Sequence, residues 1–275
     1  MDESNFKNNN KNSSSKTSKY VIALIILIAL ILLIFLLVRS CGPGNGDVSG
    51  SLSQSEAISS SGDASEESAG SSQEMQEIPE IGDEIVLGTY EQDAQEGNGE
   101  EDIMWLVLDV TEDSALLLSI KNLDCITYYP TADTVTWETS QIREWLNDDF
   151  INSSFTEEER SRILQTTVIN EDHPTYQTPG GNTTEDKIFL LSASEVEEYL
   201  PNQEDRKALN TDHARLQGAY DAGGYGVWWT RSPGIHDRAA RTVSYDGNIS
   251  ESGTGVEQDI NVVRPALWIS FSSAD

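Results

Sequence analysis

The sequence has few cysteines, histidines and basic residues. Its 275 residues include two cysteines, Cys41 and Cys125, and three histidines. Cys125 is the one cysteine in the later, globular part of the sequence, so we expect no internal disulfide there, and we expect Cys125 to be a small core residue. His173, His213 and His236 form no H-x-x-x-H or Cys/His cluster, so we expect solvated histidines and no metal site.

Positive charge is scarce as well. The chain carries 17 Lys and Arg against 47 Asp and Glu, a formal net charge of -30. Residues 1–39 hold five basic and two acidic residues, a net +3, so the remaining residues carry -33. Nucleic acids and anionic lipid headgroups bind basic patches. Residues 40–275 are therefore expected to have no nucleic-acid partner.

Catalytic and cofactor motifs are also missing. The sequence contains no G-x-S-x-G elbow, no P-loop and no H-E-x-x-H. Acidic pairs arise by chance in a chain this acidic, although a glycosidase-like pair of carboxylates is compatible with it. We expect no cofactor and no enzymatic activity.

One long hydrophobic run is present. Residues 21–38 are eighteen consecutive apolar positions, which as a helix span about 27 Å, close to the thickness of a bilayer core. Four lysines precede the run, and after Arg39 no basic residue occurs before Lys121. This asymmetry predicts a cytoplasmic N-terminus and an extracellular C-terminal part. The alternatives are a cleaved signal peptide and a lipidated Cys41.

Composition divides the chain into four parts. We expect a cytoplasmic tail (1–19), a transmembrane helix (20–39), a disordered Ser/Gly/Glu-rich stalk (40–80) and an extracellular globular domain (81–275). The protein is therefore expected in the cell membrane as a single-pass protein that contacts the bilayer through residues 20–39. Its oligomeric state stays open.

The globular part shows strand patterns at both ends and helix patterns between them. Strands are expected at 84–90, 102–110, 114–120, 225–230, 241–245, 248–251 and 262–269. Helices are expected at 139–150, 156–164 and 192–200, the last two opening with capping boxes. This order predicts an α+β domain with about three helices, whose terminal strands share one sheet.

The segment G-V-W-W-T-R-S-P-G at 226–234 is the most distinctive. Adjacent strand residues point to opposite faces, so one of Trp228 and Trp229 is expected to be exposed. We name Tyr225, Trp228, Trp229 and Arg231 as candidate ligand-binding residues, with a bracing role as the alternative for Arg231. Structural roles are expected for four further residues: Trp105, Trp145, Arg264 and Trp268. A buried Arg264 needs a carboxylate, from the protein or from a ligand.

Several short sequence motifs occur in a characteristic order. They are W-L-V-L (105–108), A-L-L-L-S (115–119), I-R-E-W-L-N (142–147), F-T-E-E-E (155–159), D-K-I-F-L-L-S (186–192), W-W-T-R-S-P-G (228–234) and V-R-P-A-L-W (263–268). This order resembles the bacterial domain of unknown function 6273 over residues 82–270. A fainter resemblance is to C-type-lectin-like domains, as in formylglycine-generating enzymes. The enzymes' late cysteines and the lectins' E-P-N or Q-P-D triplets are absent, so this second resemblance implies a non-catalytic scaffold.

These observations favour a membrane-tethered extracellular binding module whose ligand is a cell-envelope glycan or a protein. One alternative is an accessory or sensor subunit of a membrane complex. Another is an enzyme acting on cell-envelope carbohydrate or peptide, which requires a cleft with paired carboxylates or with a carboxylate beside a histidine.

Overall fold

A computed structural model of the chain describes residues 78–95 and 97–271. The expected tail, transmembrane helix and Cys41, and all but the last three residues of the expected stalk, lie outside the described residues. Within the described part, no helix has the length and apolar character needed to cross a membrane. The described residues belong to one compact unit, Ser71–Asp275.

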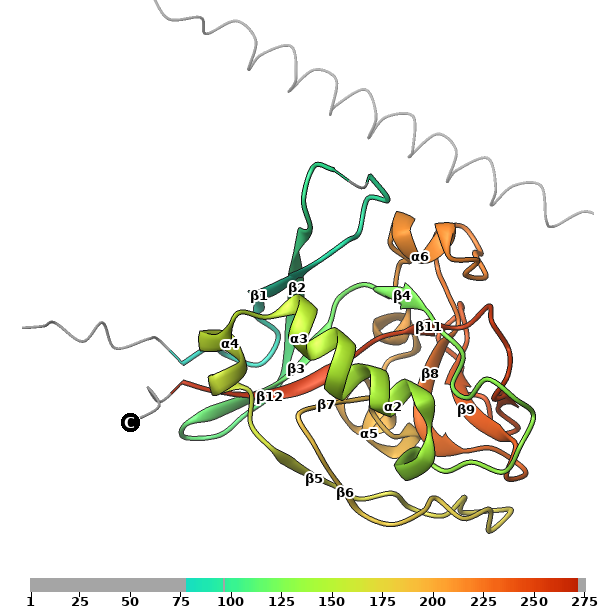
Figure 1. Ribbon diagram of the computed structural model, residues 1–275. Helices are drawn as coiled ribbons and strands as arrows, with labels where there is room; N and C mark the ends of the chain where they lie inside the picture. Colours follow the sequence, from blue (N-terminus) through green and yellow to red (C-terminus); the bar gives the residue numbers. More distant parts are fainter. Residues whose placement is uncertain (1–77, 96, 272–275) are drawn as a thin grey trace, which may run out of the picture. The chain divides into compact units, whose positions relative to one another are not determined.

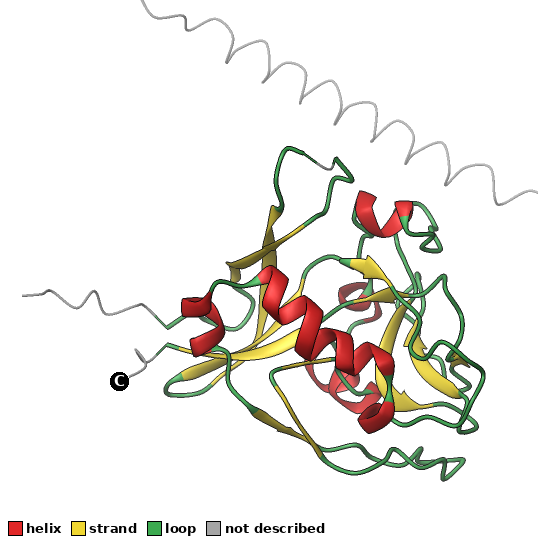
Figure 2. Ribbon diagram, viewed as in Figure 1, coloured by secondary structure: helices red, strands yellow, loops and turns green. Residues whose placement is uncertain are grey.

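The unit is α+β, as the sequence predicts, with short helices between strands (Figures 1 and 2). The strands are β1 (Glu84–Tyr90), β2 (Glu101–Val110), β3 (Ser114–Ser119), β4 (Asp124–Cys125), β5 (Thr166–Val168), β6 (Thr184–Asp186), β7 (Ile188–Phe189), β8 (Trp228–Pro233), β9 (Ala239–Val243), β10 (Thr254–Gly255), β11 (Val262–Val263) and β12 (Ala266–Ser270). The helical segments are η1 (Trp137–Thr139), α2 (Gln141–Trp145), η2 (Leu146–Phe150), α3 (Ile151–Ser154), α4 (Glu157–Arg162), α5 (Ala193–Tyr199), η3 (Gln203–Arg206) and α6 (Asp212–Leu216).

Two five-stranded sheets organise the core. The first has the order β1-β2-β3-β12-β7 and the second β10-β9-β8-β11-β4. The terminal strands β1 and β12 share the first sheet, which confirms the sequence prediction. Every residue of β3 is buried, because this central strand is covered on both faces. The buried apolar side chains form one cluster.

The two predicted capping boxes are present. Thr156 Oγ1 accepts from the Glu159 N–H and the Glu159 carboxylate accepts from the Thr156 N–H, and Ser192 and Glu195 do the same at α5. The helix expected at 139–150 differs from its prediction. It begins at Gln141, widens into a π-helical turn over η2 and continues as α3. This run contacts β1 and β7 of the first sheet (Figure 1).

The strand expected at 262–269 is in fact two strands. β11 pairs with β4 and β8 in the second sheet, whereas β12 pairs with β3 and β7 in the first. Arg264 and Pro265 form the crossing between the sheets. Pro265 therefore lies neither on a sheet edge nor in a bulge, because the chain leaves one ladder before it enters the next.

Of the two strands expected at 241–245 and 248–251, the structure confirms the turn between them at Asp246-Gly247 but not the second strand. Gly247 has φ 85°, and the Ser244 N–H donates to the Asn248 carbonyl at 2.8 Å. Beyond the turn, Val243 and Ile249 form a single bridge, and the strands that pair with β9 are β8 and β10 instead. The turn sequence predicts where the chain reverses, but it does not predict how many residue pairs the flanking segments form.

Candidate functional site

A cavity of about 540 Å³ lies beside the end of β8, next to the distinctive turn that follows the two tryptophans. We call it the loop cavity. Its lining residues come from a long loop, from α5, and from β8 and β9: Glu171, Asp172, His173, Pro174, Ser194, Glu197, Ser232, Pro233 and Arg241. The volume falls within the range of small-molecule sites in proteins.

The long loop joins β5 to β6 and covers residues 169–183. His173 anchors it, because its side chain is almost fully buried. The imidazole Nδ1 accepts from the backbone N–H groups of Thr175 and Tyr176, both at 3.2 Å, and Nε2 lies 3.0 Å from the Glu251 carbonyl. A neutral ring with its proton on Nε2 satisfies all three contacts. The histidine therefore fixes the shape of the loop.

The opposite wall is held by a buried ion pair. The Arg231 guanidinium on β8 donates to both carboxylate oxygens of Glu195 on α5. Ser232 Oγ, the next residue of β8, accepts from the Ala193 N–H at 2.9 Å at the start of α5. These contacts lock α5 against the end of β8. As a result, Ser194 and Glu197 on α5 have fixed positions relative to the β8 turn.

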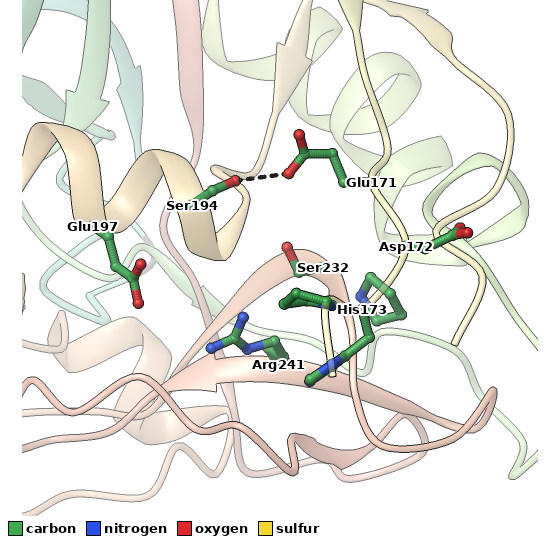
Figure 3. Close-up of a pocket in the computed structure, with 9 residues that line it drawn as sticks. Glu171, Asp172, His173, Ser194, Glu197, Ser232 and Arg241 are labelled. Carbon is green, nitrogen blue, oxygen red and sulfur yellow. Dashed lines mark hydrogen bonds between the residues drawn. The ribbon is translucent and has the colours of Figure 1, made fainter. Parts of the chain in front are cut away.

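Charged side chains and side-chain hydroxyls face the cavity. Figure 3 shows Glu171, Ser194, Glu197, Ser232 and Arg241 arranged around the same space, with Ser194 Oγ donating to Glu171 Oε2 at 3.2 Å. The exposed Glu197 carboxylate has no hydrogen-bond or salt-bridge partner among the described residues.

Two further charged groups of the cavity are engaged. The Asp172 carboxylate points away from the space and accepts from the Gly180 N–H at 3.0 Å. Arg241 is buried and pairs with Glu251 at 2.5 Å. The cavity thus offers free carboxylate oxygens and hydroxyls, which bind hydroxyl, amine and amide groups of a ligand.

The expected aromatic contact surface is not present beside the turn. Trp228 and Trp229 are both 0% exposed, which corrects the expectation that one of them faces solvent. Each indole N–H donates to a backbone carbonyl, that of Arg206 at 3.0 Å and that of Ile126 at 2.9 Å. Both faces of β8 are covered by protein, so alternation along the strand exposes neither ring.

The other two candidate ligand-binding residues are also engaged within the protein. Arg231 is buried and donates to the Leu190 and Ile169 carbonyls besides its pair with Glu195, which is the bracing role given as the alternative. Tyr225 is half-buried, with Lys207 Nζ 6.0 Å from the centre of its ring. Neither lines the loop cavity.

The four residues expected to be structural all pack in or against the core. Trp105 is fully buried and its indole N–H donates to the Leu87 carbonyl at 2.8 Å. Trp145 and Trp268 are half-buried and pack against the core cluster. Arg264 is buried between the two sheets.

The histidine prediction is correct only for His236, which is exposed. His173 is buried, as described above. His213 packs edge-on against Tyr90, with 5.7 Å between ring centres, and its Nε2 lies 3.6 Å from Asp124 Oδ1. Both histidines sit in polar sequence but are covered by distant segments, which sequence spacing does not reveal.

Cys125 is half-buried and bonds to the Asp259 carbonyl. Burial, followed by the nearby Asp124 and Asp259 carboxylates, raises the pKa of its thiol to about 12, so the thiol stays protonated at neutral pH.

One group of carboxylates in the described ranges is close enough to share a metal ion. Ligand atoms of Glu91, Asp93 and Glu101 lie within 4.8 Å of one another. Glu101 Oε2 accepts from the N–H groups of Gln92 at 2.7 Å and Asp93 at 3.2 Å, so this carboxylate already braces the β1–β2 loop.

The sequence matches one protein family, described as Domain of unknown function (DUF6273), over residues 112–271. This match covers more than half of the 275 residues. The chain belongs to this family. No curated protein and no solved structure matches the chain. The resemblance to C-type-lectin-like domains stays a prediction.

The DUF6273 match begins later than the expected start at residue 82. It leaves out β1 and β2, which nevertheless pair with β3 in the first sheet. The first sheet of this chain therefore extends beyond the matched residues. The match includes all residues that line the loop cavity.

Proposed function

We propose that this DUF6273 protein is a membrane-tethered binding module whose extracellular domain takes a hydroxyl- or amine-bearing ligand into the loop cavity. The observation that carries the proposal is the cavity itself, with free carboxylate and hydroxyl groups from three elements around one space. Carboxylates accept strong hydrogen bonds from sugar hydroxyls and from ammonium groups. Cell-envelope glycans and peptides carry both.

The tether rests on the sequence. The apolar run at residues 21–38, the lysines before it and the scarcity of basic residues after it support a single span with the domain outside the cell. A membrane-impermeant amine reagent applied to intact cells tests this, because only lysines beyond the span are then labelled. Labelling confined to broken cells would contradict the orientation.

Glu197 gives the sharpest test of the binding site, because its carboxylate faces the cavity without a partner among the described residues. The test is a binding screen against glycans and peptidoglycan fragments. We expect Glu197→Gln to weaken binding by about tenfold, the loss of one charge-assisted hydrogen bond. The control is Glu198→Gln, which removes the same charge from the next exposed position of α5, outside the cavity lining. Equal affinities of the two variants would refute the site.

A second candidate function is a carboxylate-dependent hydrolase. It is favoured by one observation, that Glu171 and Glu197 reach the same cavity from different elements. Glycoside hydrolases place two carboxyl groups on either side of the scissile bond. Product release from a bound glycan that ceases in Glu197→Gln would establish this function. Binding without turnover in the wild type would support the binding module.

A further inference from the structure

Arg264 differs from the other buried arginines of the described residues. Three arginines are nearly fully buried: Arg231, Arg241 and Arg264, which are 4%, 6% and 3% exposed. The first two pair with Glu195 and Glu251. Arg264 has no carboxylate partner among the described residues. Its Nε donates to the Ser119 carbonyl at 2.9 Å and its Nη1 to the Arg206 carbonyl at 3.2 Å. Its Nη2 has no acceptor among the described residues.

An isolated buried cation is costly, because desolvation is not offset by a counter-charge. The guanidinium carbon lies 5.1 Å from the centre of the Trp228 ring, which offsets part of this cost. Burial lowers the pKa of Arg264 to about 9, so the group remains charged at neutral pH. A negative charge supplied from outside the protein is the missing element.

Arg264 also lines a second cavity, which we call the Arg264 cavity. Its volume is about 450 Å³. Much of the wall is aliphatic, from Leu106, Leu108, Ile120 and Leu200. The cavity is separate from the loop cavity, with which it shares no lining residue.

The remaining charged groups of this cavity are mostly acidic. Lys207 Nζ is held by Glu204 at 2.8 Å, and Asp205 accepts from Asn202 at 2.8 Å. Glu84 is exposed at the start of β1, and its carboxylate has no hydrogen-bond or salt-bridge partner among the described residues. The cavity therefore combines one unpaired buried cation, one free carboxylate and an apolar wall. This combination disfavours a ligand that carries only negative charge.

We propose that the Arg264 cavity binds an apolar α-amino acid. The ligand carboxylate pairs with the Arg264 guanidinium, the ammonium group pairs with Glu84, and the side chain packs on the aliphatic wall. Arginine recognises carboxylates better than lysine does, because its planar fork donates two parallel hydrogen bonds.

The first test compares three probes on the full-length chain in mild detergent by titration calorimetry: leucine, N-acetyl-leucine and leucinamide. N-acetyl-leucine lacks the ammonium charge and leucinamide lacks the carboxylate. We expect leucine to bind and each of the other two to bind at least about tenfold more weakly. The proposal is overturned if leucine shows no binding at about 10 mM or if leucinamide binds as tightly as leucine. Equal binding of N-acetyl-leucine would overturn the role of Glu84.

The second test uses protein variants. Glu84→Gln should abolish the preference for leucine over N-acetyl-leucine, whereas Glu112→Gln, at an exposed carboxylate outside the cavity, should keep it. Arg264→Lys should weaken leucine binding at least about tenfold, provided that circular dichroism shows a folded domain. If this variant is unfolded, the comparison of probes on the wild type and on Glu84→Gln decides the question. Persistence of the preference in Glu84→Gln would refute the assignment.

Discussion

The buried carboxylate of Asp186 joins two segments that are distant in sequence, its own strand β6 and the helical segment at 137–143. It is 0% exposed and accepts three side-chain hydrogen bonds. The donors are the indole N–H of Trp137 at 2.9 Å, the Thr184 hydroxyl at 2.7 Å and Arg143 Nε at 2.6 Å. We expect Asp186→Asn to destabilise the domain, because asparagine keeps the shape but has one acceptor oxygen and no charge.

The magnitude follows from these contacts. Breaking a buried ion pair costs about 3–5 kcal/mol, and leaving a buried donor without an acceptor costs about 1–3 kcal/mol. Arg143 keeps 26% of its side chain exposed and can bind water instead, so we expect a cost near the lower end, about 3 kcal/mol. This corresponds to a loss of about 1 M in the urea midpoint and a fall of about 6–12 °C in the melting temperature.

Urea unfolding followed by tryptophan fluorescence and circular dichroism measures this loss. The control is Glu185→Gln, at the neighbouring exposed position of β6, whose carboxylate accepts from the Thr167 hydroxyl at 2.7 Å. It removes the same charge on the solvent side and should change stability by less than about 0.5 kcal/mol. A cost below about 1 kcal/mol for Asp186→Asn would refute the reasoning, since the three donors would then have found other partners.

Two other substitutions test separate features. Gly88→Ala should cost about 2–4 kcal/mol of stability in denaturant unfolding, because φ is +70° and the new Cβ would lie 2.5 Å from the Ser154 carbonyl oxygen. The control is Gly82→Ala, where φ is +95° but no atom lies within 4 Å of the new Cβ, and it should cost about 1–2 kcal/mol. Equal costs for the two variants would contradict the packing argument. Burial raises the pKa of Tyr128 well above 10, so the unfolded chain ionises first and stability is lost as the pH rises past 10. Between pH 8 and pH 11, the free energy of unfolding of Tyr128→Phe should therefore rise by about 1.4 kcal/mol relative to that of the wild type. If the difference between the two proteins does not change with pH, this reasoning is refuted.

Local signals in the sequence predicted local structure well. The capping boxes at Thr156 and Ser192 are found as expected, because both partners of each box lie within four residues. The apolar runs that became β1, β2 and β3 were also recognisable without any knowledge of their neighbours.

Features that depend on distant segments could not be predicted in this way. Alternation on a strand suggests one exposed tryptophan, yet the burial of Trp228 and Trp229 depends on what covers each face of β8. Likewise the single apolar run at 262–269 gives no sign that the chain changes sheets at Arg264.

The loop cavity is assembled from four elements, so no local motif marks it. Its strongest sequence signal is the polar segment at 169–183, which is long for a connection within a compact domain. Glu171 and Glu197 were two acidic residues among 47, and only the fold distinguishes them from the rest.

The crossing from β11 to β12 has a consequence for the order in which the protein can be made. Residues 262–270 supply an interior strand to each of the two five-stranded sheets. Neither sheet can form completely until these nine residues have left the ribosome. More than 170 residues of earlier chain therefore cannot complete their folding before that point. For the export that we propose, this delay is an advantage, because a chain must remain unfolded while it passes through a membrane pore.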